Sequence, residues 1–254
     1  MHENINYVEV TPENISEYGC YCIKDKNAAG AKAKTEWFKS KFNNGIKIII
    51  ACDSDKRQLG FIEYIPSEQA WRPVSAENYL FIHCIAIFVK GAKRKELGSA
   101  LLKLCEEDAK ANTKSGICTI ASSGAWMADK SLFEKNGYEQ CDELDKFELM
   151  VKKFNSDSAH PKLINWKENQ KQYQGWNLVY SDQCPWHTKS VNDLKAAALD
   201  FGIDLKITGF ENPADAQNSP SGFGTYSLIR DGRLLEAHYI SKTRFLNILK
   251  KEIA

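Results

Sequence analysis

The chain has 254 residues, of which 43% are hydrophobic and 26% are charged, and its formal net charge at pH 7 is +1. This size and apolar content suit one large globular domain, or two smaller ones, with an ample core. The near-zero charge argues against a general nucleic-acid-binding protein, and no apolar run approaches the roughly 20 residues that span a bilayer.

In the N-terminal part, the expected elements alternate between strands and helices. In chain order they are a strand at 6–10, helices at 13–24 and 32–42, a hairpin of strands at 46–52 and 59–65, a loop at 67–77, a strand at 79–88, a helix that carries the apolar spacing from 97 to 105, a strand at 116–121, a short helix at 129–136, and strands at 138–142 and 146–152. The strand at 79–88 is apolar on both faces, as a central strand covered on both sides should be.

The amino-acid composition changes after residue 153. Residues 154–174 are polar and lysine-rich and indicate a linker, so we expect one domain at 1–153 and another at 175–254. The elements expected in the second domain are a strand at 176–180, a helix at 189–200, a strand at 203–208, a loop rich in Asn, Pro and Ser, strands at 226–230 and 234–240, and a helix at 243–252. This order requires a parallel strand pair joined by a crossover helix, then an antiparallel hairpin that turns at Asp231-Gly232.

Eight cysteines are spread along the chain, several of them inside apolar, strand-like runs. Such positions are typical of reduced thiols in a core. The spacing of Cys20 and Cys22 is too short for a zinc knuckle and no partner pair follows, so we expect no structural metal. Reduced cysteines, with no secretory signal pattern at the N-terminus, favour a cytoplasmic protein without membrane or nucleic-acid partners.

A basic segment joins the central strand to the helix that follows it, with Gly98 and Ser99 expected at the start of that helix. Free N–H groups and the helix dipole bind anions at such a point, so we expect a pyrophosphate or a 3′-phosphate there. The alternative is an ordinary solvated turn. The expected cofactor-binding residues of this segment are Lys93, Arg94, Lys95, Gly98, Ser99 and Ala100.

The string K-R-K-E-L-G-S-A-L-L resembles the acetyl-CoA loop of the GNAT superfamily of N-acetyltransferases, written Q/R-x-x-G-x-G/A, with Lys93 first and Gly98 last. The order of elements over residues 1–152 is similar to that fold, and the L-F-E-K-N-G-Y string that ends at Tyr138 is similar to the family's Y-E-K-x-G-F. Two departures stand out. Glu96 replaces the family's first Gly, and Phe133 replaces the Tyr thought to protonate the leaving thiolate.

An alternative register starts the motif at Lys95 and keeps Gly98 as the first small residue. In either register the resemblance implies that the strand at 85–88 diverges from the strand at 117–121 and that the pantetheine arm of acetyl-CoA lies in the gap. A backbone N–H near Ile87 or Phe88 would then polarise the thioester carbonyl.

In that mechanism the acceptor amine loses its proton to a base or through water. The candidate bases are His83, on the central strand, and Glu63, on the strand 59–65. Tyr138 is a more distant candidate for the acid. The alternatives are a histidine satisfied within the core and a glutamate that faces water.

Cys184 follows a strand and precedes a helix, whose N-terminus can lower the pKa of a thiol. His187, three residues on, would add charge when protonated. The order of elements with this Cys-Pro resembles a small thioredoxin-like fold. His187 replaces the second cysteine of C-x-x-C and Gly224 stands at the cis-proline position, so a monothiol, a binding role or a structural thiol remains.

The two-part arrangement resembles bacterial GNAT proteins with a YoaP-like C-terminal domain. We therefore expect an α/β (α+β) fold, with a GNAT-like mixed central sheet flanked by helices followed by a small thioredoxin-like β-α-β-β-α domain. The function expected is transfer of an acetyl group from acetyl-CoA, as co-substrate, to the amine of a small molecule. The alternatives are a non-catalytic acyl-CoA- or ligand-binding protein with a degenerate GNAT domain, and a monothiol enzyme that uses Cys184. A homodimer is compatible with the sequence.

Overall fold

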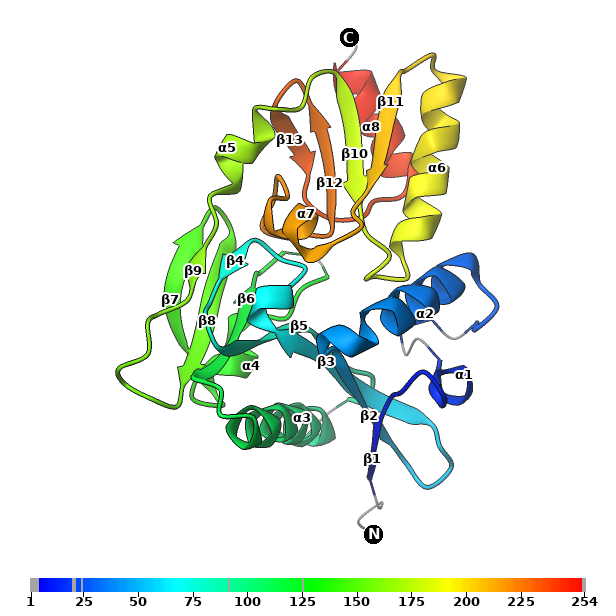
Figure 1. Ribbon diagram of the computed structural model, residues 1–254. Helices are drawn as coiled ribbons and strands as arrows, with labels where there is room; N and C mark the ends of the chain where they lie inside the picture. Colours follow the sequence, from blue (N-terminus) through cyan, green and yellow to red (C-terminus); the bar gives the residue numbers. More distant parts are fainter. Residues whose placement is uncertain (1–4, 20–21, 24, 91, 125, 253–254) are drawn as a thin grey trace. The chain divides into compact units, whose positions relative to one another are not determined.

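The computed structural model describes residues 5–19, 22–23, 25–90, 92–124 and 126–252, with the side chains of 92–95 outside that description. The chain divides into two compact units (Figure 1). The first unit consists of Met1–Tyr21, Phe38–Ala70 and Val74–Leu163, and the second of Cys22–Trp37, Trp71–Pro73 and Ile164–Ala254. The second unit thus takes two segments from the N-terminal half of the chain.

The first unit is built on a seven-stranded sheet with the order β1-β2-β3-β5-β6-β8-β7. Its strands are β1 (Asn6–Glu9), β2 (Lys47–Cys52), β3 (Gln58–Pro66), β5 (Tyr79–Ile87), β6 (Gly116–Ala121), β7 (Glu139–Leu144) and β8 (Phe147–Lys153). The β5–β6 pair is parallel and the other neighbouring pairs are antiparallel. Two short strands, β4 (Val74–Ser75) and β9 (Lys162–Leu163), form a separate antiparallel pair.

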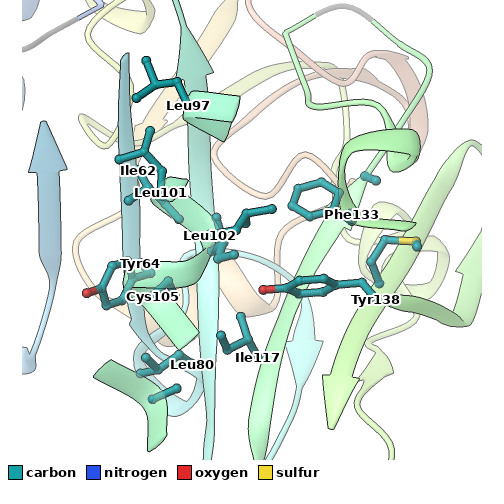
Figure 2. Close-up of a cluster of buried hydrophobic side chains, with 14 of the residues drawn as sticks. Ile62, Tyr64, Leu80, Leu97, Leu101, Leu102, Cys105, Ile117, Phe133 and Tyr138 are labelled. Atoms are coloured by element: carbon teal, nitrogen blue, oxygen red, sulfur yellow. The ribbon is translucent and has the colours of Figure 1, made fainter. Parts of the chain in front are cut away.

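Helices and 3₁₀ turns complete the first unit. They are α1 (Ile15–Tyr18), the end of α2 (Ala29–Lys41), η1 (Phe42–Asn44), η2 (Ser67–Gln69), α3 (Ala92–Ala111) and α4 (Lys130–Glu134). Helix α3 packs against β3, β5 and β6. The apolar spacing expected for this helix is confirmed, because Leu97, Leu101, Leu102 and Cys105 are all buried in one cluster (Figure 2).

The second unit holds a four-stranded sheet with the order β11-β10-β12-β13. Its elements are α5 (Trp166–Gln170), β10 (Trp176–Tyr180), α6 (His187–Asp200), β11 (Leu205–Gly209), α7 (Pro213–Gln217), β12 (Tyr226–Arg230), β13 (Arg233–Glu236) and α8 (Lys242–Glu252). Strands β10 and β11 are parallel and joined through α6, and β12 and β13 form the antiparallel hairpin. At its turn Asp231 and Gly232 have φ of 48° and 72°, as a type I′ turn requires. The thioredoxin-like description stays a prediction.

The expected α/β fold with a mixed central sheet flanked by helices is confirmed. Several local expectations are wrong. Within the described residues α1 covers only Ile15–Tyr18 of the expected helix 13–24, and α7 lies where a loop is expected. Residues 154–174, whose assignment as a linker stays a prediction, carry β9 and α5, and in α5 Trp166 is fully buried. The domain boundaries 1–153 and 175–254 stay predictions. In the part of the chain that the structure describes, no helix has both the length and the apolar character to cross a membrane.

Candidate functional site

Strands β5 and β6 diverge after a short paired stretch. Their parallel register covers only Tyr79–Phe81 against Gly116–Cys118. One residue further on, the Thr119 hydroxyl donates to the carbonyl oxygen of Ile82 at 2.9 Å. Strand β5 then continues to Ile87, paired with β3. The end of β5 therefore has a backbone edge that the ladder with β6 does not use, and this is the divergence that the resemblance implies.

The two candidate donors on β5 are distinguished by the ladder with β3. The N–H of Phe88 donates to the carbonyl of Leu59 at 2.8 Å. Hydrogen-bonding directions alternate along an antiparallel strand, so the N–H of Ile87 points to the opposite edge, away from β3. The suggestion that the Phe88 N–H serves as donor is corrected, because that group is already bonded. Phe88 is 47% exposed.

The basic segment lies in the first turn of α3 rather than in a loop before it. The helix begins at Ala92, whereas the sequence pattern places its start near Gly98. Backbone N–H groups in the first turn of an α-helix have no acceptor within the helix, so the free donors of α3 belong to this basic turn. The side chains of Lys93, Arg94 and Lys95 lie outside the described part of the structure.

From the sequence, Gly98, Ser99 and Ala100 are expected to bind phosphate through their N–H groups, and this is corrected. They lie inside α3, where backbone N–H groups bond to carbonyls four residues earlier. A Cβ on Gly98 would lie 3.1 Å from Leu132 Cδ1, so close packing against α4 accounts for this glycine. Glu96 is exposed.

The two candidate bases meet at a bulge. The register of β3 with β5 passes from Glu63 opposite Cys84 to Tyr64 opposite Ile82, so His83 is the extra residue of β5. Its Nδ1 lies 3.2 Å from Oε1 of Glu63, and the two side chains are 0% and 1% exposed. The structure therefore brings together the two candidate bases from neighbouring strands.

Tyr138 lies in the hydrophobic core and not at the edge of β5. Its ring packs edge-on against Phe133 at 5.6 Å between centroids, and both residues belong to the cluster under α3 (Figure 2). Burial raises the pKa of the Tyr138 hydroxyl well above its usual value. This position favours a packing role, and the expectation that Tyr138 serves as the acid stays a prediction.

Cys184 belongs to the second unit. It is a partly buried cysteine, outside any disulfide, just before α6, and its carbonyl accepts a hydrogen bond from the His187 N–H at 3.1 Å. The side chain of His187 is fully buried, with Nδ1 2.7 Å from the carbonyl oxygen of Ser181. Burial lowers the pKa of His187 to about 3. His187 is therefore neutral near pH 7, which corrects the idea that it adds positive charge beside Cys184. Among the described residues, no cluster of His, Cys, Asp and Glu side chains could hold a metal ion.

Comparisons with known proteins match both halves of the chain. Residues 204–247 match the family described as YoaP-like. The protein called "Uncharacterized N-acetyltransferase YoaP" from Bacillus subtilis (strain 168) is 30% identical over 251 residues, which are 96% of this chain and 98% of that protein.

Solved structures of acetyltransferases are more distant. The GNAT N-acetyltransferase YhbS from Escherichia coli in complex with CoA has a TM-score of 0.44 and 10% identity, covering 64% of this chain and 91% of its own. A GNAT acetyltransferase from Staphylococcus aureus Mu50 has a TM-score of 0.42 and 15% identity, covering 60% and 100%. Likeness at this level carries no argument about function.

Proposed function

Since the chain belongs to the YoaP family of N-acetyltransferases, we propose that it transfers an acetyl group from acetyl-CoA to the amine of a small molecule. The observation that carries this proposal is the divergence of β5 from β6: their ladder ends at Phe81, whereas β5 continues to Ile87. An extended amide-containing arm, such as pantetheine, can bond to that stretch of β5 as a further strand would.

The start of α3 follows directly on β5 and supports binding of the carrier's phosphates. The free N–H groups of the first turn and the positive end of the helix dipole favour an anion there. The sequence of this turn contributes Lys93, Arg94 and Lys95, which add charge-assisted contacts to phosphate oxygens. Glu96 is exposed, so its carboxylate can stay in water rather than against the diphosphate.

The N–H of Ile87 supports the chemical step. A donor aimed at the thioester carbonyl stabilises the negative charge that develops on its oxygen when an amine attacks. One such donor is typically worth about 10²- to 10³-fold in rate. Backbone donors are pre-organised by the strand, so this stabilisation needs no rearrangement at the moment of reaction.

Acetyl-CoA binding and turnover test the proposal. With free acetyl-CoA at 100 times its Kd, the free energy of unfolding should rise by about 2.7 kcal/mol, and thiol release should appear with at least one member of an amine panel. Arg94→Ala should weaken binding more than Lys103→Ala, because each removes one charge from α3 but Lys103 lies beyond the first turn, 76% exposed.

Three results would change the conclusion. No thermal shift at millimolar acetyl-CoA would refute it. Binding without thiol release across the panel would favour the non-catalytic acyl-CoA-binding alternative. Turnover abolished by Cys184→Ser, with acyl label found on Cys184 in the wild type, would favour the monothiol alternative.

A further inference from the structure

We propose that Trp126 and Lys146 form the subsite for the adenosine end of acetyl-CoA. The adenine ring stacks on the Trp126 indole, and the 3′-phosphate pairs with the Lys146 ammonium group. This inference rests on the proposed function, because it names the residues that hold one end of that carrier. It concerns two segments that have no part in the chemical step, the loop between β6 and α4 and the turn between β7 and β8.

The loop between β6 and α4 lies beside the start of α3. Strands β5 and β6 are parallel, so their carboxyl ends lie at the same edge of the sheet. The loop closes where the Ser122 N–H donates to the carbonyl oxygen of Ala128 at 3.3 Å. Ala128 and Leu132 pack against the same hydrophobic cluster as Leu97, which lies in the second turn of α3. Trp126 is two residues before Ala128, so it lies close to the turn proposed to bind the diphosphate.

Trp126 combines high exposure with a strained backbone. It is 62% exposed, more than any other Phe, Tyr or Trp that the structure describes. Its φ is 70°, in the left-handed region that bulky residues rarely adopt and that is found most often at functional sites. An exposed planar ring gains contact area when a nucleobase stacks on it. The position therefore suits a platform for a base.

Lys146 places a cation beside the same loop. It lies in the turn between β7 and β8, and β8 runs next to β6, with Glu148 opposite Ala121 at the end of the ladder. A Cβ at Gly124 would lie 3.5 Å from Nζ of Lys146, and Gly124 is two residues before Trp126. Lys146 is exposed and forms no ion pair with any residue that the structure describes. Its charge is therefore available to a phosphate group.

The connectivity of the carrier decides which of its groups reaches these two residues. The diphosphate joins the pantetheine arm to a ribose, and that ribose carries both the adenine and the 3′-phosphate. Because the arm is proposed to lie along β5, the ribose leaves the first turn of α3 on the side away from the acetyl group. One ring and one phosphate on the same sugar match an indole and an ammonium group on adjacent segments. The acceptor amine, by contrast, meets the acetyl group at the far end of the arm.

Truncated carriers test the two contacts separately, with Kd values taken from NMR titrations. Trp126→Ala should weaken binding of coenzyme A about tenfold, which is the order expected for one stacked base. The same variant should keep the wild-type Kd for 4′-phosphopantetheine, which lacks the adenosine end. Lys146→Ala should weaken coenzyme A about two- to fivefold and should keep the wild-type Kd for 3′-dephospho-coenzyme A. For either residue, equal losses with the whole and the truncated carrier, or no loss with coenzyme A, would overturn the subsite.

Further variants separate the loss of the ring from distortion of the loop. Trp126→Gly removes the ring but adopts a φ of 70° without steric cost, so it should fold and lose the same affinity for coenzyme A as Trp126→Ala. Trp126→Phe keeps a stacking face and should recover part of that affinity. The matched controls are Trp186→Ala, at a 40% exposed tryptophan of the second unit, and Lys103→Ala, at a 76% exposed lysine of α3. Both controls should keep the wild-type Kd for every carrier.

The outcomes distinguish this inference from the function on which it rests. If the wild type binds coenzyme A and Trp126→Gly binds it equally tightly, the subsite is refuted and the proposed function stands. If the wild type binds neither coenzyme A nor 4′-phosphopantetheine, the proposed function fails and the subsite fails with it.

Discussion

Replacing Gly60 by alanine tests the Ile87 donor without touching it. Gly60 lies opposite Ile87 in the β3–β5 ladder. A Cβ at Gly60 would lie 2.8 Å from the carbonyl oxygen of Ala86 and 2.8 Å from Cδ1 of Ile87. Real Cβ atoms essentially never lie closer than 3.0 Å and ordinary contact begins at 3.4 Å, so this part of β5 must move by about 0.2 to 0.6 Å. The Ala86 oxygen belongs to the backbone and has no side-chain rotation that could move it away, so strand β5 itself has to shift.

This shift has two measurable consequences. Overpacking of this kind lowers the free energy of unfolding by about 1–3 kcal/mol. Displacing the Ile87 N–H should also lower kcat by about tenfold to hundredfold, since a misplacement of about 1 Å can cost 10²-fold. The assay is urea unfolding alongside kcat at saturating acetyl-CoA.

The control for Gly60→Ala is a variant that loses stability elsewhere. Met150→Ala opens a cavity in the fully buried core of β8 and should cost about 2–5 kcal/mol while leaving kcat unchanged. Gly60→Ala with reduced stability and wild-type kcat would refute the assignment of Ile87. Equal rate losses in both variants would point to a general loss of rigidity instead.

Two further predictions concern the second unit. Burial lowers the pKa of His187 from 6.5 to about 3. Between these pH values only the unfolded chain takes up the proton, so the free energy of unfolding falls as pH falls, by about 1.4 kcal/mol per pH unit. Urea midpoints at pH 7 and pH 5 should show this slope, and His187→Gln should reduce it. Gly224→Ala should be more destabilising than Gly202→Ala, although both glycines have positive φ. A Cβ at Gly224 would lie 2.7 Å from the carbonyl oxygen of Trp71, whereas a Cβ at Gly202 meets nothing within 4 Å. Equal melting temperatures for the two variants would contradict this prediction.

Much of the strand framework could be predicted from local sequence. The bounds of β6, β10 and β12 are those expected, because each is a short run of strand-forming residues that ends at turn residues. The start of α3 could not be found in this way. Lysine, arginine and glutamate are good helix formers, but a turn made of them has no apolar spacing that marks it as helical.

Helix α7 has a recognisable signal in the sequence, whereas the burial of two tryptophans has none. Asn212 and Asp215 form a capping box with Pro213 in the first helical turn, so α7 had a visible start. The assignment of Trp37 and Trp71 to the second unit had no local signal. Their rings pack edge to face at 5.3 Å, and such non-local burial depends on which segments meet in the folded chain.

The candidate site, too, could be predicted from the sequence only in part. His83 and Glu63 were recognisable as unusual residues on apolar strands, but their pairing depends on a bulge, and a bulge breaks the two-residue alternation from which faces are predicted. The choice between Ile87 and Phe88 likewise needed the register with β3, which is a property of two strands together.

The central claim is that the carrier's arm lies along β5 beyond Phe81, where the ladder with β6 has ended, and amide NMR tests it most directly. In ¹⁵N-labelled protein titrated with coenzyme A, the account predicts that the amide signals of Ile87 and of the first turn of α3 shift in a saturable way. The amide of Phe88, bonded to Leu59, should stay protected from hydrogen exchange throughout. Saturable shifts confined to the second unit, or none at millimolar coenzyme A, would contradict the account.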